Sequence, residues 1–249
     1  MDLSISYIYG EAWDFAKKNI VPFLVYSLIT AAIGFVVVAV SMPVGFWSAW
    51  LETVQGNTHA AARLSQMQNG LNPLQLLQYV VSAILAVPAY NAVIGVCRGT
   101  RKFDFDCVKL PVAVYCKYVL WYIVYVLIVI LGTIFLIVPG VYLGVRLWQG
   151  GFYLIEHHDA SLKQAMAWSW EATRGRVLEL LGLLLIGIVG IIALMIPCII
   201  LVVCLGMLSS YAAIAAAIVL VAVAFMCELV YYFANGMIYT TLCKESEAI

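Results

Sequence analysis

Charged residues are scarce in this sequence. Only 10% of its 249 residues are Asp, Glu, Lys or Arg, whereas a soluble globular domain usually contains about 25%. Apolar residues make up 65% and the mean hydropathy is +1.03, so polar side chains are too few to cover a globule in water. We therefore expect an integral membrane protein with the lipid bilayer as its principal partner.

Other absences narrow the function. The formal net charge is zero, which argues against the basic surface that nucleic-acid binding requires. The chain contains no G-x-S-x-G nucleophile motif, no phosphate-binding P-loop and no H-E-x-x-H zinc motif. The opening MDLS lacks the basic segment of a cleavable signal peptide. We expect no cofactor, no metal and no enzymatic activity.

Long stretches without charge predict the membrane spans. A spanning helix needs about 20 mostly apolar residues. The predicted fold is an all-α, polytopic transmembrane helical bundle of about six spans, at residues 20–42, 74–97, 118–138, 141–156, 177–205 and 211–243. The fourth span is short and follows Pro139-Gly140, where we expect the chain to turn. Five spans plus a re-entrant helix over 141–156 is the alternative.

Two amphipathic segments are predicted to lie along the cytoplasmic face. Residues 3–18 place apolar side chains on one helical face and charged side chains on the other, a pattern that suits the headgroup region. Residues 161–175 begin with the capping-box pair Ser161 and Gln164 and end at Gly175, a residue typical of helix C-termini.

Lysine and arginine residues predict the orientation. The N-terminal segment carries two, the connection 98–117 five and the connection 157–176 three, whereas the connection 43–72 carries one and the turn 206–210 none. Because short basic connections favour the cytoplasmic side, both termini of this multi-pass chain are predicted to be cytoplasmic. The whole chain, residues 1–249, then forms a single integral membrane domain.

A threefold repeat is one interpretation of this layout. Each predicted interfacial segment is followed by a helical hairpin, which divides the chain into residues 1–97, 98–156 and 157–243. The alternative is that the ordinary sequence rules of membrane proteins produce the same alternation without any repeat. The sequence leaves both interpretations open.

A family resemblance is carried by residues 135–175, which read FLIVPGVYLGVRLWQGGFYLIEHHDASLKQAMAWSWEATRG. An apolar helix reaches Pro-Gly-x-Tyr, an Arg follows, and an Ala-x-x-x-Ser helix closes on Thr-x-Gly. This pattern resembles the glycerophosphoryl diester phosphodiesterase membrane domain family and related uncharacterised bacterial and archaeal polytopic membrane families. The residues at the shared positions are Pro139, Gly140, Tyr142, Arg146, Asp159, Ala165, Ser169, Thr173 and Gly175.

The resemblance implies a polytopic helical fold in a bacterial or archaeal cytoplasmic (inner) membrane. Its motif is structural rather than catalytic. In the named family this region accompanies a separate soluble catalytic domain. Only KESEAI follows the last predicted span, so we expect that catalytic domain to be lacking here.

Two charges inside predicted spans are the candidate functional residues. A charge at the bilayer centre costs roughly 2.5–3.5 kcal/mol on insertion scales, so each is expected to have a use. Arg146 either binds an anionic ligand or headgroup inside the bundle, or bonds structurally to carbonyls freed at the Pro139 break or to a carboxylate. Glu228 either lies on a proton or cation path or has a structural role alone.

Three functions remain open. The first is a non-enzymatic membrane scaffold, accessory or lipid-contacting module, with another membrane protein or a second copy of the chain as a partner. The second is a small transporter or channel with an internal path involving Arg146 and Glu228. The third is an enzyme on amphiphilic substrates, which requires carboxylates and His157 or His158 to meet in a cytoplasmic cleft. The triplet His157-His158-Asp159 is interpreted as a polar turn rather than a metal site, because no second ligand cluster exists.

Overall fold

The computed structural model describes residues 4–42, 45–54, 57, 59–60, 62–63, 73–208 and 210–246. Over these residues the fold is all-α, as predicted, with no strand. The chain divides into two compact units, one made of Met1–Val25 with Val87–Ile249 and one made of Tyr26–Ala86. The prediction of a single domain over 1–249 stays a prediction.

The helices of the described residues follow one another along the chain. They are α1 (Ile5–Lys18), α2 (Ile20–Ser41), α3 (Phe46–Val54), α5 (Pro73–Cys97), α6 (Val112–Phe135), α7 (Ile137–Leu147), α8 (Gly150–Glu156), α9 (Leu162–Ala172), α10 (Val177–Leu208) and α11 (Ser210–Ser246), with a 3₁₀ turn η1 (Phe105–Val108) before α6.

Among the described residues, five helices contain segments long and apolar enough to cross a membrane. These segments are Ile20–Val40, Gln78–Cys97, Val112–Phe135, Val177–Leu205 and Ala215–Ser246. They belong to α2, α5, α6, α10 and α11, and they match five of the six predicted spans to within a few residues. The chain therefore has the helices of a multi-pass membrane protein.

The remaining predicted span, 141–156, is divided between α7 and α8. These helices have 11 and 7 residues, so neither alone reaches the length of a span. The predicted turn at Pro139-Gly140 is wrong by three residues, because the extended residue is Leu136, with φ −162° and ψ 143°. Pro139 instead lies in the first turn of α7, where a missing N–H costs no helical hydrogen bond.

Unit Tyr26–Ala86 contains most of α2, all of α3 and the first part of α5. The Tyr26 hydroxyl donates a hydrogen bond to the Leu85 carbonyl and so joins α2 to α5. The rings of Phe35 and Trp47 lie 6.0 Å apart between α2 and α3. Part of the predicted connection 43–72, including residues 64–72, lies outside the described residues.

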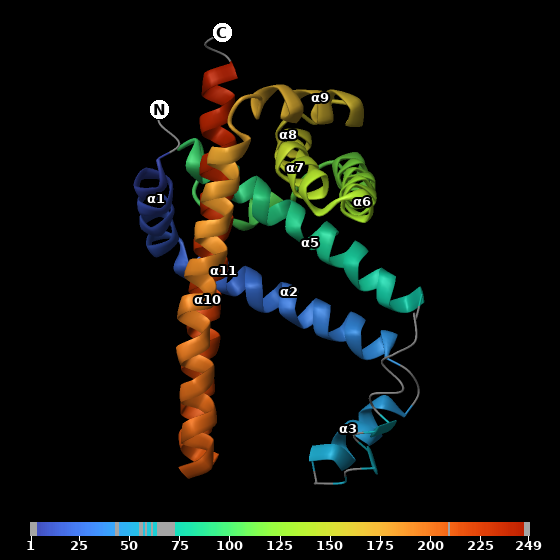
Figure 1. Cartoon of the computed structure of the whole chain (residues 1–249), viewed down its shortest axis with the longest axis vertical. Coiled ribbons are helices and arrows are strands. Elements are labelled where there is room, and N and C mark those ends of the chain that lie inside the picture. The colour runs from blue at the N-terminus through green and yellow to red at the C-terminus, as the bar shows by residue number, and fades with distance from the viewer. Residues whose placement is uncertain are drawn as a thin grey trace. The chain divides into compact units, whose positions relative to one another are not determined.

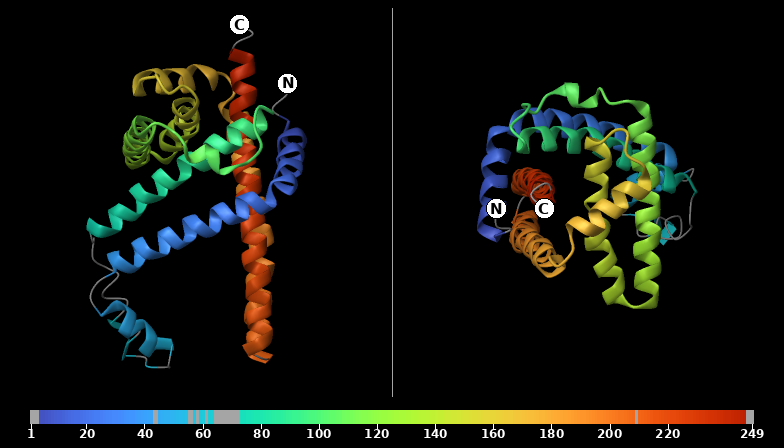
Figure 2. Two further views of the ribbon diagram at one scale, coloured as in Figure 1. Left: turned by 180° about the vertical axis from the view of Figure 1, so that it is seen from behind. Right: turned by 90° about the horizontal axis from the view of Figure 1, so that it is seen from above.

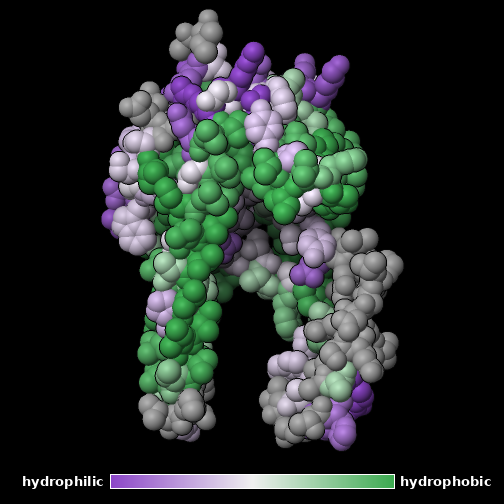
Figure 3. Space-filling model, viewed as in Figure 1, coloured by the Kyte–Doolittle hydropathy of each residue, from purple (hydrophilic) through white to green (hydrophobic). Residues whose placement is uncertain are grey.

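The larger unit is built from two helical hairpins. The α10–α11 hairpin is its longest feature, and the α6–α7 hairpin lies crosswise to it, as Figures 1 and 2 show. Helix α1 packs on α11, where the rings of Phe15 and Phe233 are 6.0 Å apart. Figure 3 shows hydrophilic side chains gathered near the chain termini and α9, and hydrophobic side chains along α10 and α11.

Candidate functional site

Arg146 is buried near the C-terminal end of α7, with only 4% of its surface exposed. Its Nη2 atom donates to the carbonyl of Trp170 at 2.8 Å. That carbonyl lies in the last turn of α9, where carbonyls lack helical donors and carry the negative end of the helix dipole. The next backbone donor, the N–H of Arg174, bonds to Glu171 at 3.0 Å instead. Arg146 therefore caps α9, and the expected bond to carbonyls at the Pro139 break is replaced by this one.

Two aromatic rings flank the Arg146 guanidinium. Its central carbon lies 4.0 Å from the ring centroid of Trp170 and 5.6 Å from that of Tyr142. Such contacts are worth about 0.5–2 kcal/mol. No carboxylate forms an ion pair with Arg146 in the part of the chain that the structure describes, and its Nε atom has no hydrogen-bond partner there. The charge is thus balanced by a carbonyl and two ring faces.

The hydrogen bonding between α7 and α9 is reciprocal. The Ser169 hydroxyl donates to the carbonyl of Arg146 at 2.7 Å, and the Thr173 hydroxyl donates to the same carbonyl at 3.4 Å. Ala165, Ser169 and Thr173 are all fully buried, and their spacing of four residues places them on one face of α9. We call α7 and α9, joined by these bonds, together with α8 between them in the chain, the α7–α9 clamp.

Glycines allow close approach to this clamp. A Cβ atom at Gly140 would lie 2.1 Å from the Thr133 hydroxyl and 2.7 Å from the Thr133 backbone nitrogen. A Cβ at Gly151 would lie 2.6 Å from the Trp121 ring. The backbones of α7 and α8 therefore approach α6 where only glycine fits. After α9, Gly175 has a φ of 78°, in the turn where a helix stop was predicted.

The segment His157-His158-Asp159 forms the turn between α8 and α9. The His157 ring stacks on Tyr153 with centroids 4.2 Å apart, and Asp159 is exposed. The predicted capping box is confirmed, because Ser161 and Gln164 exchange both hydrogen bonds at the start of α9. Among the described residues, no group of three His, Cys, Asp or Glu side chains could hold a metal ion.

An ion pair that the sequence did not reveal joins α5, α8 and α11. The Nε and Nη2 atoms of Arg98 lie 2.7 and 2.8 Å from the two carboxylate oxygens of Glu156. Tyr239 donates to the same carboxylate at 2.6 Å. Because Arg98 and Glu156 are 58 residues apart, no local spacing could have predicted the pair. Glu156 is thereby engaged in a contact between helices.

Glu228 lies on α11 with an exposed side chain. In the described part of the chain it forms no ion pair, so the structure does not bring it together with Arg146. One residue is bonded to α9 and the other faces outward from its own unit. The two candidates therefore do not form a common site.

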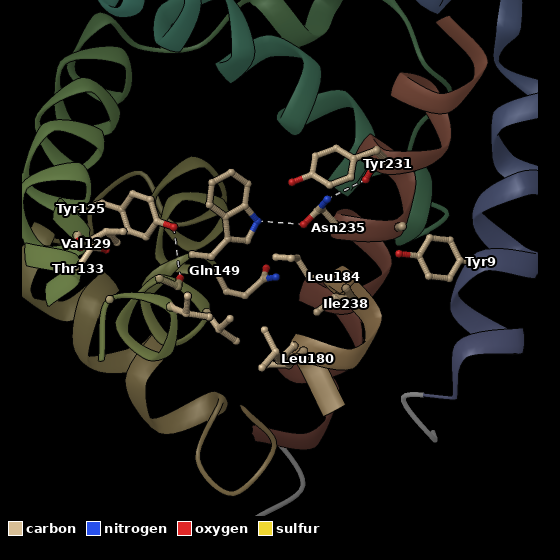
Figure 4. Close-up of a pocket in the computed structure, with 17 residues that line it drawn as sticks. Tyr9, Tyr125, Val129, Thr133, Gln149, Leu180, Leu184, Tyr231, Asn235 and Ile238 are labelled. Atoms are coloured by element: carbon tan, nitrogen blue, oxygen red, sulfur yellow. Dashed lines mark hydrogen bonds between the residues drawn. The ribbon is translucent and has the colours of Figure 1, made fainter. Parts of the chain in front are cut away.

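A cavity of about 290 Å³ lies beside the clamp, lined by residues of α1, α6, α7, α10 and α11 together with Trp148 and Gln149 (Figure 4). Trp148 donates through its indole nitrogen to the Asn235 side chain at 2.9 Å. Gln149 is 3% exposed, and its Oε1 atom has no partner among the described residues. Neither Arg146 nor Glu228 lines the cavity.

Sequence reasoning missed the residues of this cavity. Gln149 and Asn235 are neutral amides inside predicted spans, and that placement is the signal that could have drawn attention to them. Because neither side chain is charged, the charge pattern of the sequence does not reveal them. One place where this unit has room for a ligand is this cavity, which neither candidate charge lines.

Comparison of the chain with protein-family models, with curated proteins and with solved structures gives no match. The resemblance to the phosphodiesterase membrane domain therefore rests on the motif residues themselves. In the structure, Arg146, Ser169 and Thr173 of that motif bind one another across helices. Their contacts are those of packing residues.

Proposed function

We propose that the chain is a non-enzymatic, lipid-contacting module of a bacterial or archaeal cytoplasmic membrane, related to the phosphodiesterase membrane domains through their shared motif. The observation that carries this proposal is the engagement of Arg146. The one buried charge of the motif caps α9 and lies against two aromatic rings, so its guanidinium serves helix packing, and it does not line the cavity beside it.

The exposed surface supports contact with lipid. Large apolar side chains are exposed on the candidate spans, with Leu178 at 83%, Val189 at 62% and Ile134 at 73%. Water disfavours such a surface, whereas hydrocarbon covers it without cost. Within the larger unit, the Arg98–Glu156 pair lies instead where helices contact one another.

The proposed topology has six passes and cytoplasmic termini, with α7 and α8 together forming the fourth pass. Support comes from Lys117 at the start of α6, which donates to the carbonyls of His158 and Ala160 at 2.8 and 3.0 Å. This contact brings the beginning of α6 and the end of α8 to the same side. Since both ends lie in basic connections, that side is the cytoplasmic one.

The tip of the α6–α7 hairpin tests the pass count. Val138 is 78% exposed, so a Val138→Cys variant is expected to react with a membrane-impermeant thiol reagent from the outer face of sealed cells. Reaction of a cysteine at Thr100 should occur only from the inner face. If the tip cysteine reacts from neither side, the hairpin ends inside the bilayer and six passes is wrong.

Reconstitution in vesicles tests the function. With phospholipids brominated on their acyl chains, tryptophan fluorescence should be quenched relative to unbrominated vesicles, because Trp13 and Trp170 are partly exposed. Glycerophosphodiesters added to the same vesicles should release no glycerol phosphate. Turnover of a glycerophosphodiester that disappears in the Glu156→Gln variant would overturn the non-enzymatic proposal.

A further inference from the structure

The cavity beside the α7–α9 clamp has the composition of a binding site for a small amphiphile. Its volume of about 290 Å³ is close to the lower limit of small-molecule sites, roughly 300 Å³. Hydrocarbon forms most of its wall, including Val129, Val141, Leu184 and Ile238. No Asp, Glu, Lys, Arg or His is among the described residues that line it.

Most polar atoms of this wall already have partners. The Tyr125 hydroxyl donates to the carbonyl of Gly144 at 3.3 Å. The amide of Asn235 accepts from Trp148 at 2.9 Å and donates to the carbonyl of Tyr231 at 2.8 Å. These bonds fix the indole of Trp148 as one side of the cavity, and Figure 4 shows them as dashed lines.

Gln149 differs from these residues. It is 97% buried, since its exposure is 3%, and its Oε1 atom has no hydrogen-bond donor among the described residues. Figure 4 shows its amide directed into the cavity. Buried carbonyl oxygens without a donor are rare in folded proteins because they lose their hydration without replacement. A ligand that donates one hydrogen bond would correct this deficit.

We propose that the cavity binds a small single-chain amphiphile with a neutral hydroxyl head, whose hydroxyl donates to Gln149 Oε1. The apolar wall takes the alkyl chain, because burial of hydrocarbon is favourable. A charged head is excluded, since no charged side chain lines the cavity to replace its hydration. The nearest basic group in sequence, Arg146, is bonded to Trp170.

A medium-chain alcohol and a monoacylglycerol share this chemistry. This inference rests on the proposed function, because the amphiphile reaches the cavity from the surrounding bilayer.

Photolabelling of the full chain in a mild detergent tests the proposal. The probe is decanol carrying a diazirine on its chain, and the labelled peptides are identified by mass spectrometry. We expect saturable labelling of the cavity helices α6, α7, α10 or α11, with competition by unlabelled decanol or by monodecanoylglycerol; the stronger competitor identifies the natural source. The matching decanoate probe, with its carboxylate ionised, should label at least about tenfold less.

Three variants complete the test. Gln149→Leu keeps the size of the side chain but removes the acceptor, and should reduce labelling about tenfold. Gly144→Leu should reduce labelling by filling the cavity, since the nearest atoms to its Cβ lie 3.6 and 3.7 Å away. Gln78→Leu changes an exposed glutamine of α5 outside the cavity and should label like the wild type.

Each contrary outcome is distinct. Equal labelling of the wild type by the alcohol and the acid would overturn the neutral head, and this comparison needs no variant. Unchanged labelling of a folded Gln149→Leu protein would overturn the role of Gln149. Absence of saturable labelling in protein that remains inserted in membranes would overturn the binding of an amphiphile and leave the proposed function intact. Failure to insert at all would overturn the proposed function itself.

Discussion

The α7–α9 clamp and the α10–α11 hairpin solve the problem of membrane burial differently. In the clamp, Arg146, Ser169 and Thr173 join helices through hydrogen bonds, and glycines let backbones meet. Along α10 and the first part of α11, many large apolar side chains are exposed. Helices that contact protein thus depend on particular atoms, whereas an exposed apolar helix face, which the proposed function places against lipid, needs only a suitable composition.

The largest expected effect is that of removing the Arg146 charge. Arg146→Met should lower the free energy of unfolding by about 2–4 kcal/mol, because it removes one charged hydrogen bond and two cation–π contacts. Denaturation in mixed detergent–SDS micelles measures the change. Arg146→Lys should recover only part of it, since an ammonium cannot stack on Trp170 as a planar guanidinium does.

Arg174 provides the matched control for Arg146. It follows α9 of the same clamp but is exposed, and its guanidinium pairs with Glu171. Arg174→Met should change the free energy of unfolding by less than about 0.5 kcal/mol. Equal stability of the Arg146 and Arg174 variants would show that the clamp does not depend on the buried charge.

A glycine pair compares the two regions directly. Gly140→Ala should destabilise the protein by about 1–3 kcal/mol, because the new methyl group meets the Thr133 backbone. Gly182→Ala in α10 has no atom within 4 Å of its Cβ. It should be neutral or slightly stabilising, because alanine favours helix. Thermal unfolding of both variants in one detergent gives the comparison, and similar losses at the two sites would remove the distinction between regions.

Weakening the ion pair that joins α5, α8 and α11 should lower the free energy of unfolding by a smaller amount. Glu156→Gln weakens the bidentate contact with Arg98. The side chains of Arg98 and Glu156 are 32% and 21% exposed. Solvent screening limits the expected loss to about 1 kcal/mol. Tyr239→Phe removes the third partner and should cost about as much. Glu171 belongs to an exposed ion pair and provides the control. If Glu171→Gln lowered the free energy of unfolding as much as Glu156→Gln, this assignment would be contradicted.

The smallest effect concerns reactivity rather than stability. Burial raises the pKa of the Cys107 thiol to about 11, so the thiolate that reacts with maleimide is scarce near neutral pH. Its labelling rate should rise as the pH approaches that value. A cysteine introduced at the exposed neighbour Val108, in a Cys107→Ser background, should react much faster near neutral pH. Equal rates would show that η1 is open to solvent.

The sequence predicted what depends on neighbours along the chain. Charge-free stretches located α2, α5, α6, α10 and α11, and the Ser161–Gln164 pattern located the start of α9. The error at Pro139 has a local cause as well. Proline is compatible with both a turn and a first helical turn, and the sequence pattern did not distinguish them.

Contacts between distant segments could not be predicted in the same way. Arg146 was recognised as a charge with a purpose, but its partner is a backbone carbonyl, and every residue has one. Arg98 and Glu156 meet only because α5 and α8 end at the same place. Gln149 attracts no attention in the sequence, since its significance is the lack of a partner inside a cavity.

By itself, the sequence determined the helical class, the long apolar helices and the positions of most helix ends. These depend on hydropathy, capping residues and helix length, which are properties of consecutive residues. Only the tertiary structure decided that Arg146 is a helix cap, that Glu228 stands apart from it, and that a cavity surrounds Gln149. Those outcomes depend on which helix faces meet, because a polar group's role follows from the atoms that replace its water.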